Sequence, residues 1–196
     1  MWLWHLQIID SNLLRDFVIA GHVNLSKVKE LLTDHPELLD MPYSWTETDR
    51  ETAIMAAAQT GNAAVAEYLL AKGAPLSICT AAMLGRTREI DAILIEHPEK
   101  IHERGAHSIP LLAHAALSGK PELVRTLFER GATEGSSFAM HNAASLGYQD
   151  MAKWLLENAK PDVNWRNYQG KTALTIARDR KDEPMVSLLR THGGQD

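Results

Sequence analysis

Cysteine is almost absent from this sequence, whose 196 residues include only Cys79. A single cysteine excludes an internal disulfide and any zinc site built from several cysteines. No uninterrupted apolar stretch approaches the ~18 residues that a membrane-spanning helix needs. No run of Lys or Arg occurs and the formal charge is -5, which weighs against nucleic acid and anionic membranes as partners. Since 45% of the residues are apolar, the chain has enough material for a sizeable globular core.

The motifs of catalysis and metal binding are also missing. There is no Gly-x-Ser-x-Gly elbow, phosphate-binding Gly-rich loop, dinucleotide fingerprint or His-Glu-x-x-His pair. His97, His102 and His107 are five residues apart, a spacing that does not align metal ligands on one helix. We therefore expect a protein that is not an enzyme and that holds neither a metal ion nor a cofactor.

One pattern recurs along the chain: an Ala pair, then a Gly, then apolar residues five and eight positions after that Gly. Spacings of three and four between apolar residues place them on one helical face, so each copy predicts two short helices separated by the Gly. The Ala pair keeps the first helix thin, which lets a neighbouring helix approach closely. Four copies are clear, with the Ala pairs and glycines at Ala56-Ala57 and Gly61, Ala81-Ala82 and Gly85, Ala115-Ala116 and Gly119, and Ala143-Ala144 and Gly147.

Two degenerate copies place Val23 and Lys181 at the Gly position. Helix pairs this short cannot bury their own apolar faces and must stack on one another, so the pattern predicts an all-α solenoid. Cys79 falls inside a first helix where small apolar residues are expected, which predicts a buried and unreactive thiol.

Several segments resemble the ankyrin-repeat family. Residues 52–57 (Thr-Ala-Ile-Met-Ala-Ala) are similar to its Thr-Pro-Leu-His-x-Ala signature, and residues 162–174 resemble its hairpin and helix start. His141 stands at the family's His position, although Phe138 replaces the Thr. The resemblance covers residues from about 11 to 193 and implies an ankyrin-repeat solenoid of about six units in one domain, 1–196. The predicted repeats are 11–41, 42–74, 75–98, 99–132, 133–160 and 161–193.

The spacing of the repeats is uneven. Successive Gly positions are separated by 38, 24, 34, 28 and 34 residues, whereas the family step is about 33. Long and short steps alternate, so we expect β-hairpin fingers only on the units centred on Gly61, Gly119 and Lys181. Gly170 matches the family turn that needs a positive φ, and we expect the turns with Arg50 and Ser108 at this position to differ from it.

The resemblance implies a concave face of fingers and first helices that usually grips proteins. Fingers on alternate units would leave wide grooves, which we expect to accept a helix or a folded protrusion. Trp45 and Trp165 occupy matching places on two fingers and are either exposed anchors or packed within the fingers. The candidate partner-binding residues are Trp45, Thr48, Asp49, Gln59, Thr60, His107, Leu117, Ser118, Trp165, Tyr168 and Gln169.

The first nine residues are apolar, lack a basic leading segment and are followed by no small-residue cleavage site. This argues against a secretory signal, so a cytoplasmic location is expected. We expect residues 1–10 to cap the first repeat of a monomer. The alternative is a homodimer contact or hydrophobic partner site through Trp2 and Trp4, which would make the protein a self-associating structural element.

Overall fold

A computed structural model of the chain describes residues 10–195. The predicted cap and self-association segment, apart from Asp10, therefore lies outside the described residues. Contacts divide the chain into two compact units, which meet in sequence between Pro75 and Leu76. The single domain predicted for residues 1–196 stays a prediction.

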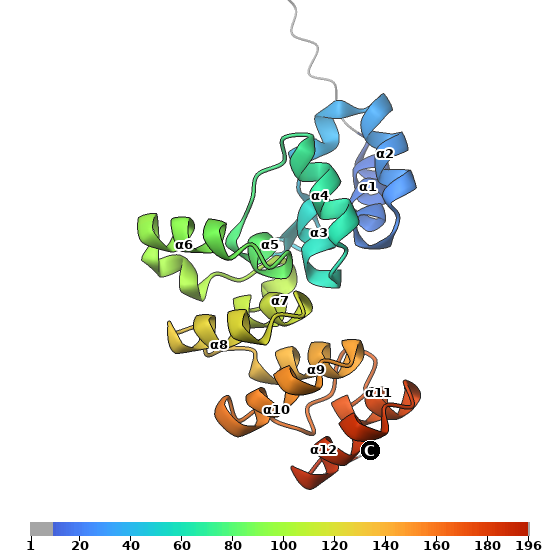
Figure 1. Ribbon diagram of the computed structural model, residues 1–196. Helices are drawn as coiled ribbons and strands as arrows, with labels where there is room; N and C mark the ends of the chain where they lie inside the picture. The colour runs from blue at the N-terminus through green and yellow to red at the C-terminus, as the bar shows by residue number, and fades with distance from the viewer. Residues whose placement is uncertain (1–9, 196) are drawn as a thin grey trace, which may run out of the picture. The chain divides into compact units, whose positions relative to one another are not determined.

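The first unit contains two helical hairpins and one small antiparallel sheet (Figure 1). The strands pair Tyr43 with Glu51 and Ser44 with Arg50. The elements are α1 (Ser11–Val23), α2 (Leu25–Asp34), the 3-10 helix η1 (Pro36–Asp40), β1 (Tyr43–Ser44), β2 (Arg50–Glu51), α3 (Ala53–Thr60) and α4 (Ala63–Ala71).

The second unit contains four helical hairpins. Its first helices are α5 (Ile78–Met83), α7 (Leu111–Leu117), α9 (Ser136–Leu146) and α11 (Ala173–Asp179). Its second helices are α6 (Thr87–Glu96), α8 (Pro121–Glu129), α10 (Gln149–Asn158) and α12 (Glu183–Thr191). Two 3-10 helices, η2 (Pro98–His102) and η3 (Ala106–Ser108), lie between α6 and α7.

The first helices of each unit stack directly on one another. In the second unit α7 contacts α5 and α9, and α9 contacts α11 (Figure 1). The second helices form a second row, in which α10 contacts α8 and α12. Both members of every Ala pair are fully buried. In the first unit α1 lies so close to α3 that a Cβ on Gly21 would be 2.5 Å from the Ala53 carbonyl oxygen. Small side chains thus permit the close stacking, as the sequence pattern predicts, and the all-α repeat fold is confirmed.

The glycine of the repeat ends each first helix in a left-handed conformation. Gly61, Gly85, Gly119 and Gly147 have φ values of 74°, 65°, 71° and 76°. Lys181 adopts the same conformation with φ 58°, which its position in the repeat predicts. The first repeat is different: Val23 stays helical, and the next residue, Asn24, caps both α1 and α2.

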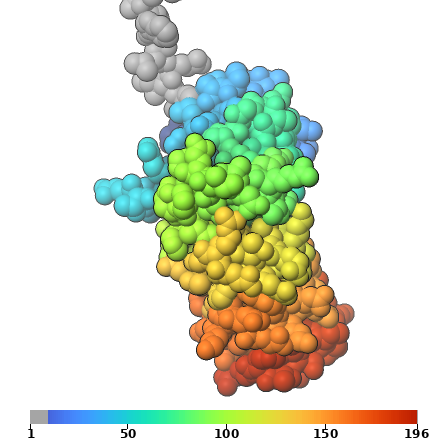
Figure 2. Space-filling model, turned by 60° about the vertical axis from the view of Figure 1, so that its left-hand side comes forward, coloured from blue at the N-terminus to red at the C-terminus, as the bar shows by residue number. Residues whose placement is uncertain are grey.

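The long connections occur on alternate repeats, as predicted from the spacing. We call them the first finger (residues 42–52), the second finger (103–110) and the third finger (161–172). The first finger is a two-stranded hairpin that projects from the first unit (cyan in Figure 2). The second is pinned by one bridge, Arg104 with Pro110, and the third is a hydrogen-bonded loop in which the structure assigns no strand.

The turns of the fingers differ in part as expected. Gly170 has the positive φ that was predicted, 73°. Arg50 lies in β2, so its turn has a different conformation. Ser108, however, adopts φ 57° like Gly170, although it carries a side chain.

Candidate functional site

The first finger is built around a buried carboxylate. The side chain of Glu51 is fully buried, and its Oε2 accepts a hydrogen bond of 2.7 Å from the indole Nε1 of Trp45. The ring of Tyr43 packs edge-on against Trp45 with 4.8 Å between the ring centroids. Trp45 is therefore half-buried, and its polar atom is used within the finger rather than offered to a partner.

The same carboxylate ties the finger to two helices. Gln59 at the end of α3 donates from Nε2 to Oε1 of Glu51 over 2.8 Å. His22 at the end of α1 places its Nε2 3.4 Å from the same oxygen. The hydrogen bond to Glu51 raises the pKa of His22, against the opposing effect of burial. Gln59, a predicted contact residue, thus belongs to an internal polar network.

The tip of the first finger is ordered and polar. The Asp49 carbonyl accepts a hydrogen bond of 2.9 Å from the Trp45 amide, and the Thr46 hydroxyl accepts one of 3.1 Å from the Asp49 amide. Thr48 and Glu47 are exposed, whereas Asp49 is half-buried. Of the two predicted tip residues, Thr48 is the one that faces solvent more fully.

The second finger holds two residues in a strained conformation. His107 and Ser108 have φ values of 54° and 57°, and each such residue with a side chain costs about 1 kcal/mol or more. Arg104 stabilises the loop, because its Nη1 donates to the Ser108 carbonyl over 3.0 Å and its Nη2 bonds the carboxylate of Glu134. The predicted contact residue His107 is exposed at the tip of this loop.

The third finger contains a packed tryptophan at its base. Trp165 lies against Phe138, with ring centroids 5.5 Å apart, and edge-on to His141 at 4.9 Å. The Trp165 carbonyl lies 2.9 Å from Nε2 of His141, and the imidazole is buried. Burial lowers the pKa of His141, although the hydrogen bond to the carbonyl opposes the shift. Trp165, like Trp45, is half-buried and packs within its finger.

The tip of the third finger is fixed by its own polar groups. The side-chain oxygen of Asn167 accepts hydrogen bonds of 2.9 Å and 3.0 Å from the amides of Gln169 and Lys171. The Asn167 amide bonds the Lys171 carbonyl over 3.0 Å, and the Gly170 amide bonds the Asn167 carbonyl over 2.8 Å. Tyr168 stands on this loop with 94% of its surface exposed, and Gln169 is also exposed.

Residues after the last helix brace the base of the third finger. The Gln195 amide donates to the side-chain oxygen of Asn164 over 2.7 Å, and the Gln195 carbonyl accepts from the Thr172 hydroxyl over 3.0 Å. The Asn164 side-chain nitrogen donates to the Gly193 carbonyl over 3.1 Å. The finger is thus held from both its tip and its base.

The predicted contact residues at the ends of first helices are partly occupied by internal bonds. The Thr60 hydroxyl donates to the His22 carbonyl over 2.8 Å, and the Ser118 hydroxyl donates to the Ala115 carbonyl over 2.6 Å. Leu117 is half-buried. The hydroxyls of Thr60 and Ser118 are thus used for hydrogen bonds inside their own units.

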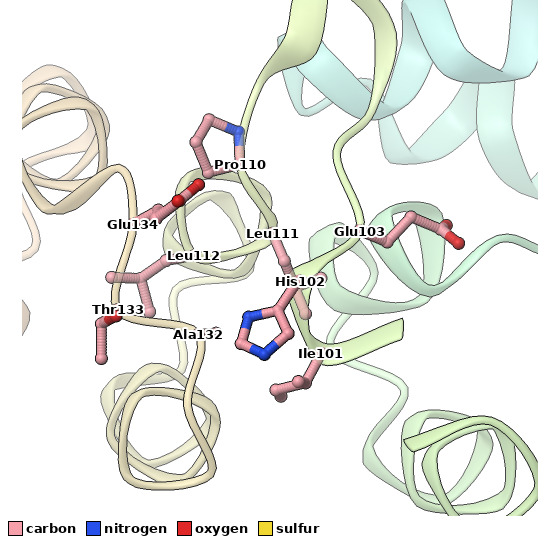
Figure 3. A pocket seen from close by; sticks show the side chains of 9 residues that line it. All are labelled: Ile101, His102, Glu103, Pro110, Leu111, Leu112, Ala132, Thr133 and Glu134. Carbon is pink, nitrogen blue, oxygen red and sulfur yellow. The ribbon is translucent and has the colours of Figure 1, made fainter. Parts of the chain in front are cut away.

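One shallow hollow lies in the second unit beside the second finger (Figure 3). Its floor is apolar, with Ile101, Leu111 and Leu112, and its rim includes His102 and Glu134. It has room for about one water molecule, which excludes a drug-sized ligand at this place.

Cys79 is buried as predicted. Desolvation raises the pKa of its thiol to about 12, and the negative charge of Glu103 adds to the shift. A raised pKa favours the protonated thiol, which is a poor nucleophile, in agreement with the unreactive role predicted from the sequence.

The sequence reasoning missed Glu51 and His22 as the centre of the network under the first finger. A Glu directly before the Thr that caps α3 reads in sequence as an exposed charge, since nothing nearby in the chain shows that it is buried. Phe138 was noted only as a departure from the family Thr. Its aromatic character, near His141 and before the finger that carries Trp165, is the signal that could have predicted the ring cluster.

The stacked helical hairpins with intervening fingers define a repeat protein of the solenoid class. The family model described as "Ankyrin repeats (3 copies)" matches residues 112–196, and the one described as "Ankyrin repeat" matches residues 49–81. The chain therefore belongs to the ankyrin-repeat family. Ankyrin repeats are in general protein–protein interaction modules, and the family is typically non-enzymatic.

Curated relatives share parts of this chain. An ankyrin repeat-containing protein of Treponema pallidum (strain Nichols) is 34% identical over 96 residues, which cover 46% of this chain and 32% of that protein. The BTB/POZ domain and ankyrin repeat-containing protein NPR1 of Oryza sativa subsp. indica is 38% identical over 84 residues, 42% of this chain and 14% of that protein. The ankyrin repeat protein FPV014 of fowlpox virus is 32% identical over 102 residues, 49% of this chain and 22% of that protein. The matched segments span about a third or less of these relatives.

The described helices are all too short or too polar to cross a bilayer.

Proposed function

We propose that the chain is a non-enzymatic module that binds a protein partner through its fingers and the adjoining ends of its first helices. The exposure of Tyr168, 94%, on a loop fixed by four hydrogen bonds within residues 167–171 carries this proposal. A rigid, exposed aromatic loses little conformational entropy on binding and is a typical energetic centre of an interface.

The exposed residues of the other finger tips are further proposed contacts. Thr48 and His107 face solvent at the tips of the first and second fingers, and Gln169 lies beside Tyr168. Trp45 and Trp165 stabilise the first and third fingers, because their rings pack against other aromatic rings there. Partner contacts by the half-buried residues Asp49, Gln59, Leu117 and Ser118 are proposed for the edges of the surface only.

The test is affinity capture from a cell extract with the full chain and with two variants, followed by mass spectrometry. Tyr168→Ala removes an exposed side chain and is expected to abolish capture of a heterologous partner without unfolding the protein. Lys153→Ala changes an exposed residue of α10 and is the matched control. Equal capture by wild type and Tyr168→Ala would contradict the proposal.

The alternative function is a structural element that self-associates through its hydrophobic first residues. Light scattering of the intact chain and of a form that lacks residues 1–9 separates the two functions. A dimer that dissociates on truncation, together with no dependence of capture on Tyr168, would favour the alternative. A monomer in both forms would favour the binding module.

A further inference from the structure

One side of α1 carries exposed apolar side chains. Val23 is 78% exposed and Ile19 is 41% exposed. They are the two exposed large hydrophobic residues of the part of the first unit that the structure describes. Since they are four positions apart in one helix, their side chains are neighbours on its surface, and we call the pair the α1 patch.

The α1 patch lies on the side of α1 that faces away from α3. Gly21 marks the opposite side, because a Cβ on it would lie 2.5 Å from the Ala53 carbonyl oxygen. Each helical residue turns the side-chain direction by about 100°, so residues two positions before and two positions after Gly21 point about 160° away from it. Ile19 and Val23 are those residues.

The position of Ile19 is filled differently in other repeats. It lies four residues before Val23, which takes the place of the repeat glycine. In the four repeats whose first helix packs on a preceding first helix in the same unit, this position is a fully buried alanine: Ala57, Ala115, Ala143 and Ala177. An Ile holds a neighbouring helix further away than an Ala does, so the α1 patch favours an occupant thinner than a helix.

The chain itself supplies an apolar segment directly before α1. Residues 1–9 lie outside the described residues, and their sequence alternates in a way that suits an extended segment. In such a segment every second side chain shares one face, and His5 and Gln7 fall on the other. The residues of the apolar face are Trp2, Trp4, Leu6 and Ile8. Asp10, which caps α1, has an extended backbone with φ -60° and ψ 121°.

The lengths of the segment and of α1 also match. An extended chain rises about 3.3 Å per residue and a helix about 1.5 Å, so two residues of the segment span about as much as four residues of α1. For a segment that runs back along α1 from Asp10, Leu6 lies at about 13 Å and Ile19 at about 13.5 Å from Asp10. Trp4 lies at about 20 Å, level with Val23 at about 19.5 Å.

We propose that residues 1–9 dock in an extended conformation on the side of α1 opposite α3, with Leu6 against Ile19 and Trp4 against Val23 of the same chain. The segment then covers the apolar end of the first unit, which would otherwise favour association. This inference does not depend on the proposed binding function. It adds the face, the direction and the register of an intramolecular contact.

Pairs of engineered cysteines test the contact in the full chain. The native Cys79 is buried, so the engineered cysteines are the accessible thiols. Under mild oxidation, Leu6→Cys with Ile19→Cys is expected to form a disulfide within one chain about tenfold faster, or more, than the control pair, because docking raises the local concentration of the two thiols. The control pair is Leu6→Cys with Ala64→Cys, which is exposed on α4 in the next hairpin. Gel electrophoresis without reductant and peptide mass spectrometry identify the disulfide.

A second measurement separates docking from local effects on α1. Val23→Ser should lower the urea midpoint of the full chain by more than it lowers the midpoint of a chain that lacks residues 1–9. Ile95→Ser on α6 is the matched control, because Ile95 is 80% exposed and Val23 is 78% exposed. The control should shift the midpoints of both chains equally. Circular dichroism checks that each variant keeps its helices.

The outcomes keep this inference apart from the proposed function. Equal rates for the two cysteine pairs, or an equal effect of Val23→Ser in the two chains, would overturn the docking and leave the binding function standing. A disulfide that joins two chains would also overturn it and favour the self-associating structural element. A disulfide between positions 6 and 19 of one chain, with a larger effect of Val23→Ser in the full chain, supports the docking whether or not Tyr168→Ala alters capture.

Discussion

Replacing Trp165 by Ala should damage the fold, whereas replacing Tyr168 by Ala should not, although the two residues are three positions apart. The ring of Trp165 lies 5.5 Å from Phe138 and 4.9 Å from His141, and its backbone carbonyl lies 2.9 Å from the buried imidazole. Tyr168 is 94% exposed, and its hydroxyl accepts a hydrogen bond from the neighbouring Gln169.

The expected magnitudes follow from this packing. A fully buried Trp that is cut to Ala costs about 3–5 kcal/mol, and aromatic pairs add about 0.5–1.5 kcal/mol each. Since Trp165 keeps part of its surface exposed, we expect a loss of about 2–3 kcal/mol in the free energy of unfolding. For Tyr168→Ala we expect a change within about 0.5 kcal/mol.

Urea unfolding followed by far-ultraviolet circular dichroism measures both effects without depending on tryptophan fluorescence. The midpoint of Trp165→Ala should fall clearly below that of wild type, and the midpoint of Tyr168→Ala should coincide with it. If Trp165→Ala were as stable as wild type, the ring would not hold the finger to α9. The assignment of Trp165 to support and Tyr168 to binding would then be refuted.

Further predictions concern backbone strain and pH. Lys181→Gly should raise the free energy of unfolding by about 0.5–1 kcal/mol, because glycine relieves the strain of the left-handed conformation by more than its entropy cost. Lys153→Gly, inside α10, should instead lower the free energy of unfolding by about 1 kcal/mol. Urea midpoints that move in the same direction for both variants would contradict this explanation. Burial lowers the pKa of His141 below 6.5, so the unfolded state binds one proton more readily than the folded state. The free energy of unfolding should therefore fall as the pH drops below about 6.5. In urea titrations at several pH values, His141→Gln should reduce the change of this free energy with pH. The pH dependence of stability that His22 causes has the opposite sign, because its pKa is raised in the folded state. Its contribution to stability is complete below about pH 6.5 and is lost as the pH rises through the pKa of the folded state. Glu51→Gln should remove this pH dependence. Glu51→Ala should cost about 3–5 kcal/mol, because it removes a fully buried carboxylate and leaves the half-buried donors of Trp45 and Gln59 without their acceptor. A near-wild-type melting curve would refute this network.

Local chemistry made much of the fold predictable. Glycine tolerates a positive φ, so its recurrence marked the ends of the first helices, and His35 and His97 followed by Pro marked the ends of α2 and α6. The uneven spacing likewise predicted fingers on alternate repeats. Such signals depend only on neighbours in the chain, which is why they can be interpreted without coordinates.

The fingers themselves were less predictable. The three long segments have similar lengths but form a hairpin, a strained loop and a hydrogen-bonded turn. Their conformations depend on contacts with residues far away in sequence, such as Arg104 with Glu134 and Asn164 with Gln195. A spacing argument contains no information on those contacts.

The order of residues was enough to predict the family, the ends of the four first helices that stop at a glycine and the left-handed position that Lys181 shares with those glycines. Each of these follows from the conformational preference of one residue or from a periodic apolar pattern. Tertiary structure alone decided that Trp45 and Trp165 support the fingers while Tyr168 projects from one, and that Glu51 is a buried acceptor rather than a surface charge. Exposure is a property of the neighbours that folding brings together, and side chains of the same type in equivalent repeats acquire different surroundings for that reason.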